Sequence, residues 1–284
     1  MKAVMWMFGA MISFSLMAVG GRELSGELSI FQTLFIRSVL GLICLTLVIT
    51  FSKQKGLIGT QKLGLHVFRN IFHFAGQYGW FVGIGLLPMA EVFALEFTTP
   101  VWTLIIAALF LGEKITQRKV ISICFGLLGV LIIVQPGYAI VDVASLIVLG
   151  AAVTFAISYS ATKYLSASEK PISILFYMCV IQLPIGLVMS IEGWVTPVGI
   201  QWLWLSVVGL AALAAHYCTI KAMQHAEITT IVTLDFLRLP FIALLGVLLY
   251  AEAFELALLI GGALMLLGNL FNIKGFGSRK KGQQ

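Results

Sequence analysis

The chain is a succession of long apolar runs separated by short turns, and this pattern limits its fold more than any other feature. A helix that crosses a bilayer needs about 20 mostly apolar residues, and each run has roughly that length. The runs are continuous rather than alternating, which excludes the strands of a membrane barrel. The sequence therefore predicts an all-α integral membrane protein with ten transmembrane helices. The spans are expected at residues 3–20, 29–51, 66–86, 89–111, 118–135, 144–164, 172–190, 200–222, 228–250 and 254–273.

Composition excludes a water-soluble domain. Hydrophobic residues make up 60% of the chain and charged residues only 11%, whereas ordinary soluble domains carry about 25% charged residues. A soluble protein needs more charge than this to cover its surface. The four cysteines lie inside apolar runs without paired spacing. We therefore expect no disulfide, no metal site and no cofactor.

The positions of lysine and arginine predict how the helices are oriented. If the N-terminus is inside, fourteen of the 18 basic residues fall in cytoplasmic segments, Arg22 falls outside, and three lie within spans. Such a bias is the positive-inside signal. We therefore expect a multi-pass protein of the cell inner (plasma) membrane, with both termini cytoplasmic and a basic tail at 274–284. This topology accounts for the net charge of +6 and indicates no nucleic-acid partner.

The chain also resembles itself at a constant offset of 139 residues. The Leu-acid-Phe triplet at 95–97 and the later Glu113 fall on a second such triplet at 234–236 and on Glu252. The repeat unit is therefore five helices. Because five is odd, the second half enters the membrane from the opposite side, which is typical of secondary transporters with a site near the midplane. The expected divisions are a first half at 1–137, a second half at 138–273 and the tail at 274–284.

Several motifs carry a resemblance to a known family. The sequence PMAE at 88–91 is followed by Pro100, by LGEKIT at 111–116 and by GLLGVLIIVQPG at 126–137. With ten helices in two halves, the chain resembles the drug/metabolite transporter superfamily, EamA type, over essentially its whole length. The second half repeats the pattern more loosely and lacks the Gly-Glu-Lys.

This resemblance implies metabolite transport through a central cavity lined mainly by the first, third, fourth, sixth, eighth and ninth helices. Arg37 and the segment GLHVFRNIFHFAG at 64–76 are most similar to a branch that includes S-adenosylmethionine and organic-anion carriers. The cargo classes that the resemblance implies are amino-acid-like, S-adenosylmethionine-like and organic-anion metabolites.

Ionisable side chains within the spans are the first candidates for transport chemistry, because each costs at least ~2.5 kcal/mol in lipid without a partner or a wet cavity. Asp235 and Arg238 are three residues apart, near enough on a helix to neutralise each other. Glu96 has no cation at that spacing, so it is either paired with Arg37 or protonated. Glu96 and Asp235 are thus the candidates for proton coupling. The full group is Arg37, Arg69, Glu91, Glu96, Asp235 and Arg238.

Polar side chains also recur along one face of the third helix. This stripe forms either the wall of a cavity or a helix–helix seam joined by hydrogen bonds. In the eighth helix, His216 and Tyr217 match Gln77 and Tyr78 of the third, which favours a shared central site; the alternative is that His216 is an ordinary core histidine. The stripe consists of Arg69, His73, Gln77 and Trp80.

The remaining substrate-binding candidates are hydroxyl and aromatic residues of the first, fourth and sixth helices. They are Ser13, Phe14, Thr99, Trp102, Thr154, Ser158 and Tyr159. Glycines of the fifth and tenth helices, such as Gly129 and Gly261, indicate close packing as a structural or dimer seam, with a hinge as the alternative. We expect a monomer or a homodimer.

The chain contains no His-Glu-x-x-His, Gly-x-Ser-x-Gly or Walker motif, so we expect neither an enzyme nor an ATP-driven pump. The favoured hypothesis is a secondary-active carrier that moves a small polar organic metabolite by alternating access, driven by protons or by exchange. A membrane-embedded enzyme and a passive channel using the same polar residues are the alternatives. The expected partners are the metabolite and the lipid bilayer.

Overall fold

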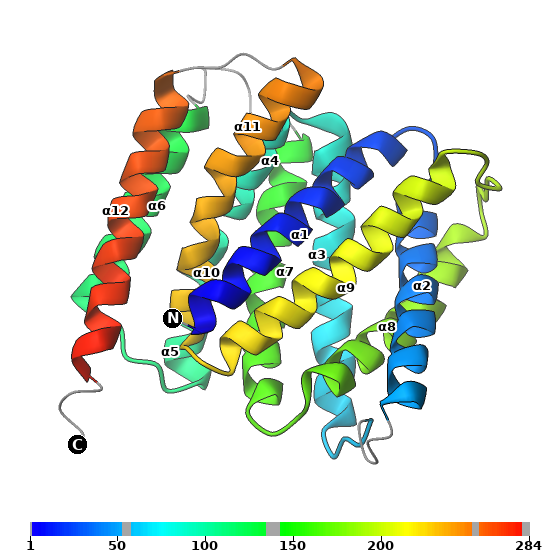
Figure 1. Cartoon of the computed structure of the whole chain (residues 1–284), viewed down its shortest axis with the longest axis horizontal. Helices are drawn as coiled ribbons and strands as arrows, with labels where there is room; N and C mark the ends of the chain where they lie inside the picture. The colour runs from blue at the N-terminus through cyan, green and yellow to red at the C-terminus, as the bar shows by residue number, and fades with distance from the viewer. Residues whose placement is uncertain (1, 53–57, 135–142, 252–255, 280–284) are drawn as a thin grey trace.

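The computed structural model describes residues 2–52, 58–134, 143–251 and 256–279, which fold into a bundle of helices (Figure 1). No strand occurs in these ranges, and the prediction of an all-α protein is confirmed. The predicted turn at 135–137, Glu252 and four of the loop and tail lysines lie outside the described residues. The elements are α1 (Lys2–Leu24), α2 (Ile30–Phe51), α3 (Leu63–Leu86), α4 (Met89–Glu96), α5 (Thr99–Phe110), α6 (Gln117–Val134), α7 (Val143–Ser166), α8 (Pro171–Ser190), α9 (Gln201–Met223), α10 (Ile228–Leu234), the 3-10 turn η1 (Asp235–Leu237), α11 (Arg238–Tyr250) and α12 (Leu256–Arg279).

Several of these helices are long and apolar enough to cross a membrane. Within the described residues, six stretches meet both criteria, namely α1, α2, α7, α8, α9 and Ile228–Tyr250. Thr99–Phe110 and Leu259–Gly268 are shorter apolar helices. The chain is a multi-pass membrane protein, and the orientation of its helices and termini stays a prediction. The helix α12 continues to Arg279, beyond the predicted end at residue 273.

The span expected at 89–111 is not a continuous helix, and this part of the prediction is wrong. It is divided into α4 and α5 around Phe97 and Thr98. The cause is Pro100, which has no N–H and whose ring crowds the carbonyl four residues before it, that of Glu96. The hydroxyl of Thr99 donates to this freed carbonyl at 2.5 Å. The break is therefore built into the local sequence.

The span expected at 228–250 is one apolar helical stretch, Ile228–Tyr250, and it tightens into a single 3-10 turn near its middle. The helix α10 ends at Leu234, η1 follows, and α11 begins at Arg238. Pro240 supplies no N–H to the carbonyl of Phe236, so one hydrogen bond of a regular α-helix is missing at this point. Glu96 and Asp235, which match in the internal repeat, consequently both lie at helix breaks.

The most extensive helix contacts join segments before residue 135 to segments after residue 142. The helix α1 packs on α9, α3 on α7, α2 on α8 and α6 on α12. Figure 1 shows the α6 and α12 pair at one edge of the bundle. Buried residues of both parts belong to one large hydrophobic core. The two sequence segments are therefore interleaved around a common interior.

Glycines allow α6 and α12 to approach closely. A Cβ atom at Gly129 would lie 2.6 Å from the carbonyl oxygen of Gly261, and one at Gly268 would lie 2.8 Å from the Cβ of Phe125. Small residues permit such backbone contact between membrane helices. The glycine seam expected from the sequence is thus a contact within one chain.

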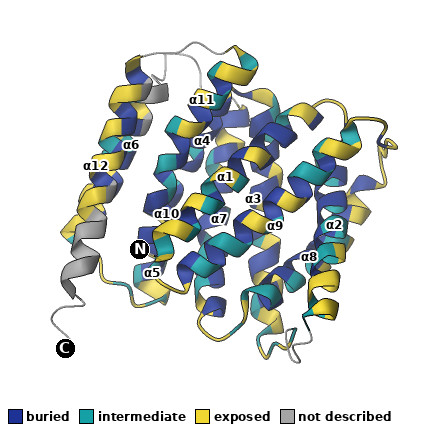
Figure 2. Cartoon of the chain, in the orientation of Figure 1, coloured by how far each residue is buried: buried dark blue, intermediate teal, exposed yellow. Residues whose placement is uncertain are grey.

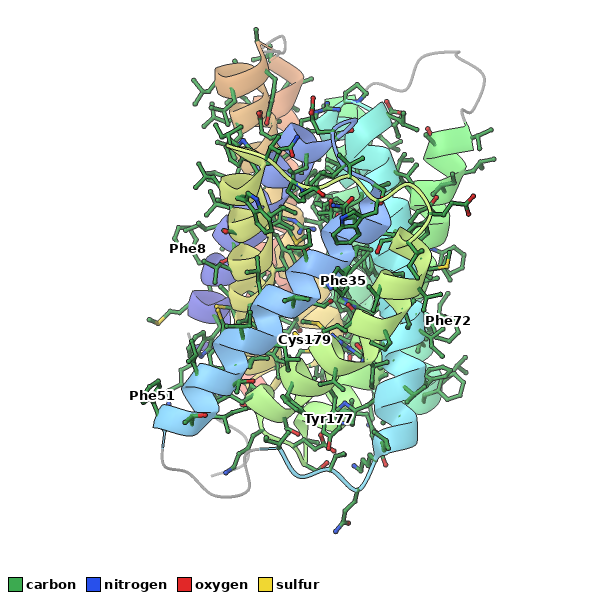
Figure 3. All side chains as sticks on the ribbon, turned by 90° about the vertical axis from the view of Figure 1, so that its right-hand side faces the viewer. Phe8, Phe35, Phe51, Phe72, Tyr177 and Cys179 are labelled. Carbon is green, nitrogen blue, oxygen red and sulfur yellow. The ribbon has the colours of Figure 1, made fainter. Side chains whose placement is uncertain are left out.

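Buried residues face the interior of the bundle and exposed residues its surface (Figure 2), and many of the exposed ones are large and apolar. Phe93 is fully buried, whereas Phe8 and Phe51 are 63% and 78% exposed, and Figure 3 shows both projecting away from the bundle. Cys179 lies inside, where it packs against Gly41 between α8 and α2. The exposed apolar side chains form the kind of surface that lipid covers.

Candidate functional site

Three charged side chains meet at the two helix breaks, and we call Glu96, Asp235 and Arg238 the charge triad. Nη2 of Arg238 lies 2.7 Å from Oε1 of Glu96 and 2.9 Å from Oδ2 of Asp235. Nε1 of Trp80 donates to the other oxygen of Glu96 at 2.8 Å. Arg238 is only 1% exposed. The predicted pairing of Asp235 with Arg238 is confirmed, and the same guanidinium also neutralises Glu96.

Aromatic rings surround the cation of the triad. The guanidinium carbon of Arg238 lies 4.9 Å from the ring centre of Phe14, 4.7 Å from that of Phe93 and 5.7 Å from that of Phe97. These distances permit cation–π attraction. Because the rings also exclude water, the two carboxylates provide the charge compensation that a buried arginine needs.

The expected pairing of Glu96 with Arg37 is wrong. Nη2 of Arg37 donates to Oε1 of Gln77 at 2.9 Å and to Oε1 of Gln182 at 2.5 Å. Spacing along a helix does not indicate which residues of other helices come close. The two helix breaks face each other across the interior, and this brings Arg238 to Glu96 from a distant part of the chain.

A second buried cluster surrounds Arg37, and we call Arg37, Arg69, Asn70, His73, Gln77 and Gln182 the amide cluster. Nε2 of Gln182 lies 3.2 Å from Oδ1 of Asn70 and 2.8 Å from Nδ1 of His73. Arg69 donates to Oδ1 of Asn70 at 2.7 Å and to Thr162 at 3.0 Å. The polar stripe of α3 is thus joined to α2, α7 and α8.

A small cavity separates the triad from the amide cluster. Its volume is about 10 Å³, which is room for about one water molecule. Most of its walls were predicted from the sequence. The lining residues are Phe14, Met17, His73, Gln77, Trp80, Glu96, Phe155, Tyr159, His216 and Arg238.

The other predicted site residues do not line this cavity. Trp102 is 41% exposed, and Tyr217 packs edge-on against Trp6, with ring centres 5.9 Å apart. Ser13 and Thr154 donate to carbonyls of their own helices. The residues that belong to the two clusters or to the helices around them are Arg37, Arg69, Thr99, Ser158 and Asp235.

Gln182, like Asn70, belongs to the amide cluster but is not among the site residues predicted from the sequence. It is fully buried in α8 and bonds Arg37, Asn70 and His73. Two signals could have identified it: at an offset of 145 residues, close to that of the internal repeat, it matches Arg37, and it is a polar residue in the middle of an apolar span.

The end of the bundle that carries the α5–α6 turn is closed by a charged network. The carboxylate of Glu113 accepts hydrogen bonds from the backbone of Ile228 at 2.7 Å and from Thr229 at 2.6 Å. Nζ of Lys119 lies 2.9 Å from Glu113 and 2.9 Å from Glu227. Burial disfavours the charged carboxylate, but these hydrogen bonds and the charge of Lys119 hold the pKa of Glu113 below its ordinary 4.5.

The opposite end is held by the last turn of α1 (Figure 1). Arg22 donates to the carbonyl of Ile84 at 2.7 Å. The hydroxyl of Tyr250 donates to Glu23 at 3.0 Å, and Arg22 also lies over the Tyr250 ring. Polar contacts therefore tie the helices together at both ends, with a nearly filled cavity between them.

The chemistry available to this site is binding and proton exchange. The described residues include no group of three or more histidine, cysteine or acidic side chains that could hold a metal. What they offer are two carboxylates on one arginine, two histidines with ring centres 4.7 Å apart, and aromatic faces. Broken helices that meet at a buried polar site are the architecture of a membrane transporter.

Comparison with known families agrees with this class. The model of the EamA-like transporter family matches residues 1–135 and 143–273. The chain belongs to this family of the drug/metabolite transporter superfamily, and the resemblance stated from the sequence motifs is confirmed. Members of the family are transporters and not enzymes.

Similar curated proteins carry different metabolites. The riboflavin transporter of Brucella anthropi is 32% identical over 75% of this chain and 77% of its own length. The S-adenosylmethionine uptake transporter of Rickettsia felis is 25% identical over 94% of this chain and 91% of its own. The pseudopaline exporter of Pseudomonas aeruginosa is 25% identical over 90% of each chain.

A solved crystal structure shares the fold. It superposes with a TM-score of 0.78 at 19% identity and covers 95% of this chain and 96% of its own. At this identity the likeness concerns the fold alone.

Proposed function

We propose that the protein is a secondary-active carrier that moves a small polar organic metabolite across the cytoplasmic membrane by alternating access. The cargo site is the cavity between the charge triad and the amide cluster. The observation that carries this proposal is the position of Glu96 and Asp235, which lie at two helix breaks and share Arg238. Half-helices that meet at a buried site are where carriers bind cargo and coupling ions.

The closed cavity supports alternating access over a passive pore. Its volume of about 10 Å³ admits no metabolite, so cargo enters only when one end opens. The Glu113 network closes one end and the Arg22 contacts close the other. Opening one set while the other stays closed exposes the cavity to one side at a time.

The triad supports coupling to protons or to exchange. Arg238 compensates two carboxylates at once. Protonation of one carboxylate, or binding of a charged cargo, therefore changes the net charge at both helix breaks. Each half-helix is then free to tilt without leaving an unpaired charge in the interior.

The cavity walls support a cargo with a ring as well as polar groups. Phe14, Trp80, Phe155 and Tyr159 line the cavity, and the last two are stacked with ring centres 5.8 Å apart. Aromatic faces stack on planar rings. Riboflavin and S-adenosylmethionine, carried by the relatives, both contain such rings, and we assign cargo of this class to the present chain.

The test is transport in proteoliposomes with a panel of ring-bearing metabolites, with and without a pH gradient. Saturable uptake that a proton gradient drives uphill is expected for at least one compound, with the solute chemically unchanged. The variants Glu96→Gln, Asp235→Asn, His73→Ala and Arg37→Ala should lose uptake, whereas Thr46→Val on the exposed face of α2 should not. Native uptake rates in all four of these variants would refute the proposed site. Flux that only equilibrates and never saturates would indicate a channel.

A further inference from the structure

Two arginines of the amide cluster are buried without a carboxylate. Arg37 is 4% exposed and Arg69 1%, and among the described residues their hydrogen bonds go only to neutral side chains. Nη1 of Arg37 has no hydrogen-bond partner. A buried cation is costly unless an anion compensates it. The interior of this protein therefore has an excess of positive charge on the side of the cavity away from the triad.

Arg37 also determines which way the neighbouring amides face. A guanidinium is a donor only, so Gln77 and Gln182 must both direct their carbonyl oxygens toward it. The amide nitrogen of Gln77 is then left free of any partner. Since Gln77 lines the cavity, its unused hydrogen-bonding capacity consists of N–H donors.

The same orientation fixes the tautomer of His73. The nitrogen that Gln182 presents to Nδ1 of His73 is a donor, so Nδ1 accepts, at 2.8 Å. A neutral imidazole that accepts at one nitrogen carries its proton on the other. Nε2 of His73 is therefore an N–H donor, and it has no partner. His73 lines the cavity as well.

The result is a part of the cavity wall where two donors, from His73 and Gln77, have no partner and an uncompensated positive charge lies behind them. We propose that this wall binds an oxyanion group of the cargo, a carboxylate or a phosphate. His73 and Gln77 contact the oxyanion, and Arg37 supplies charge and holds both side chains in the donating orientation. A water molecule could satisfy the donors but would leave the positive charge uncompensated. On the opposite wall, the two oxygens of Glu96 are already bonded by Trp80 and Arg238.

This inference rests on the proposed function, because it assigns a subsite within the same cavity. It is tested by binding rather than by flux. The purified full chain is assayed by thermal shift with two matched pairs, riboflavin 5′-phosphate against riboflavin, and S-adenosylmethionine against its decarboxylated form. Each pair differs by one oxyanion. At least one oxyanion-bearing member should bind about tenfold or more tightly than its partner, since charge-assisted hydrogen bonds are the strong ones.

Three variants test the roles of Arg37 and Gln77. Gln77→Glu places a carboxylate beside Arg37, and Arg37→Gln removes the charge; both should reduce the tenfold preference to nearly none. Arg37→Lys, which keeps the charge but cannot hold both amides, should retain only part of it. Gln224→Glu, the same substitution on an exposed residue, should leave the preference unchanged.

The outcomes separate this inference from the carrier proposal. If no oxyanion-bearing compound binds more tightly than its partner, or if Arg37→Gln keeps the full preference, the oxyanion subsite is refuted. Uptake of the neutral members alone would then leave the carrier proposal standing. Tight, Arg37-dependent binding of an oxyanion with no flux of any compound would support the subsite and remove the carrier.

Discussion

Replacing Arg238 by methionine would remove the cation that Glu96 and Asp235 share. Methionine has a similar length and an apolar end, so it fills much of the space among the surrounding rings. Two carboxylates at 2.7 Å and 2.9 Å from the guanidinium would lose their partner. Glu96 would keep only its bond from Trp80. We expect a marked loss of stability because the charges stay buried after their compensation is gone.

The magnitude follows from those contacts. Removing one partner of a buried ion pair costs about 3–5 kcal/mol, chiefly because the other charge stays buried. The cation–π contacts add about 1–2 kcal/mol for a desolvated site, and the methionine side chain recovers part of this by packing. The free energy of unfolding of Arg238→Met should therefore fall by about 3–5 kcal/mol.

The assay is reversible unfolding in mixed micelles, followed by circular dichroism, for the native protein and three variants. The triple variant Glu96→Gln, Asp235→Asn, Arg238→Met has no buried charge in the triad and should recover at least half of the loss. Arg118→Met, on an exposed residue, should change stability by less than about 0.5 kcal/mol. If Arg238→Met is as stable as the native protein, or if the triple variant recovers nothing, the triad does not carry the charge balance described.

Three further predictions concern packing, the closed end and the helix break. Gly129→Ala should cost about 1–3 kcal/mol by separating α6 from α12, whereas Gly150→Ala, which meets nothing within 4 Å, should be neutral or slightly stabilising in thermal unfolding. Because the pKa of Glu113 is lowered, its contribution to stability is present above pH 4.5 and is lost as the pH falls further; Glu113→Gln should abolish that acid-dependent loss of melting temperature. Thr99→Val leaves the Glu96 carbonyl without its hydroxyl donor and should cost about 1 kcal/mol, and an unchanged melting temperature would contradict this account of the break.

Periodicity and composition predict the helices well, because a lipid-facing helix must be apolar along its whole length. They do not predict the two interruptions, although Pro100 follows Glu96 by four residues and Pro240 follows Asp235 by five. Each proline was placed in a continuous span. Its effect is on a carbonyl four residues earlier, and there it separates Glu96 and Asp235 from the helices that follow.

The candidate site was predicted in part, because a lipid-facing helix must be apolar and its polar residues therefore stand out. Polar residues in an apolar span are few, so most of the cavity walls are found by listing them, as with His73, Gln77 and His216. Their partners are not found this way. Spacing within a helix gives no partner to Arg37 or to Glu96, and the structure gives each a different one, Gln182 and Arg238.

The amino-acid sequence by itself determined that lipid surrounds most of the chain, where the helices lie, and that five helices form the repeat unit. It also determined the few polar residues that cannot face lipid. It did so because burial in a bilayer allows few exceptions to an apolar side chain. Only the tertiary structure decided which charges compensate each other and which stay uncompensated. Those pairings depend on distances of about 3 Å between side chains on helices that are far apart in the chain. These distances exist because the two helix breaks face each other and because α2 packs on α8.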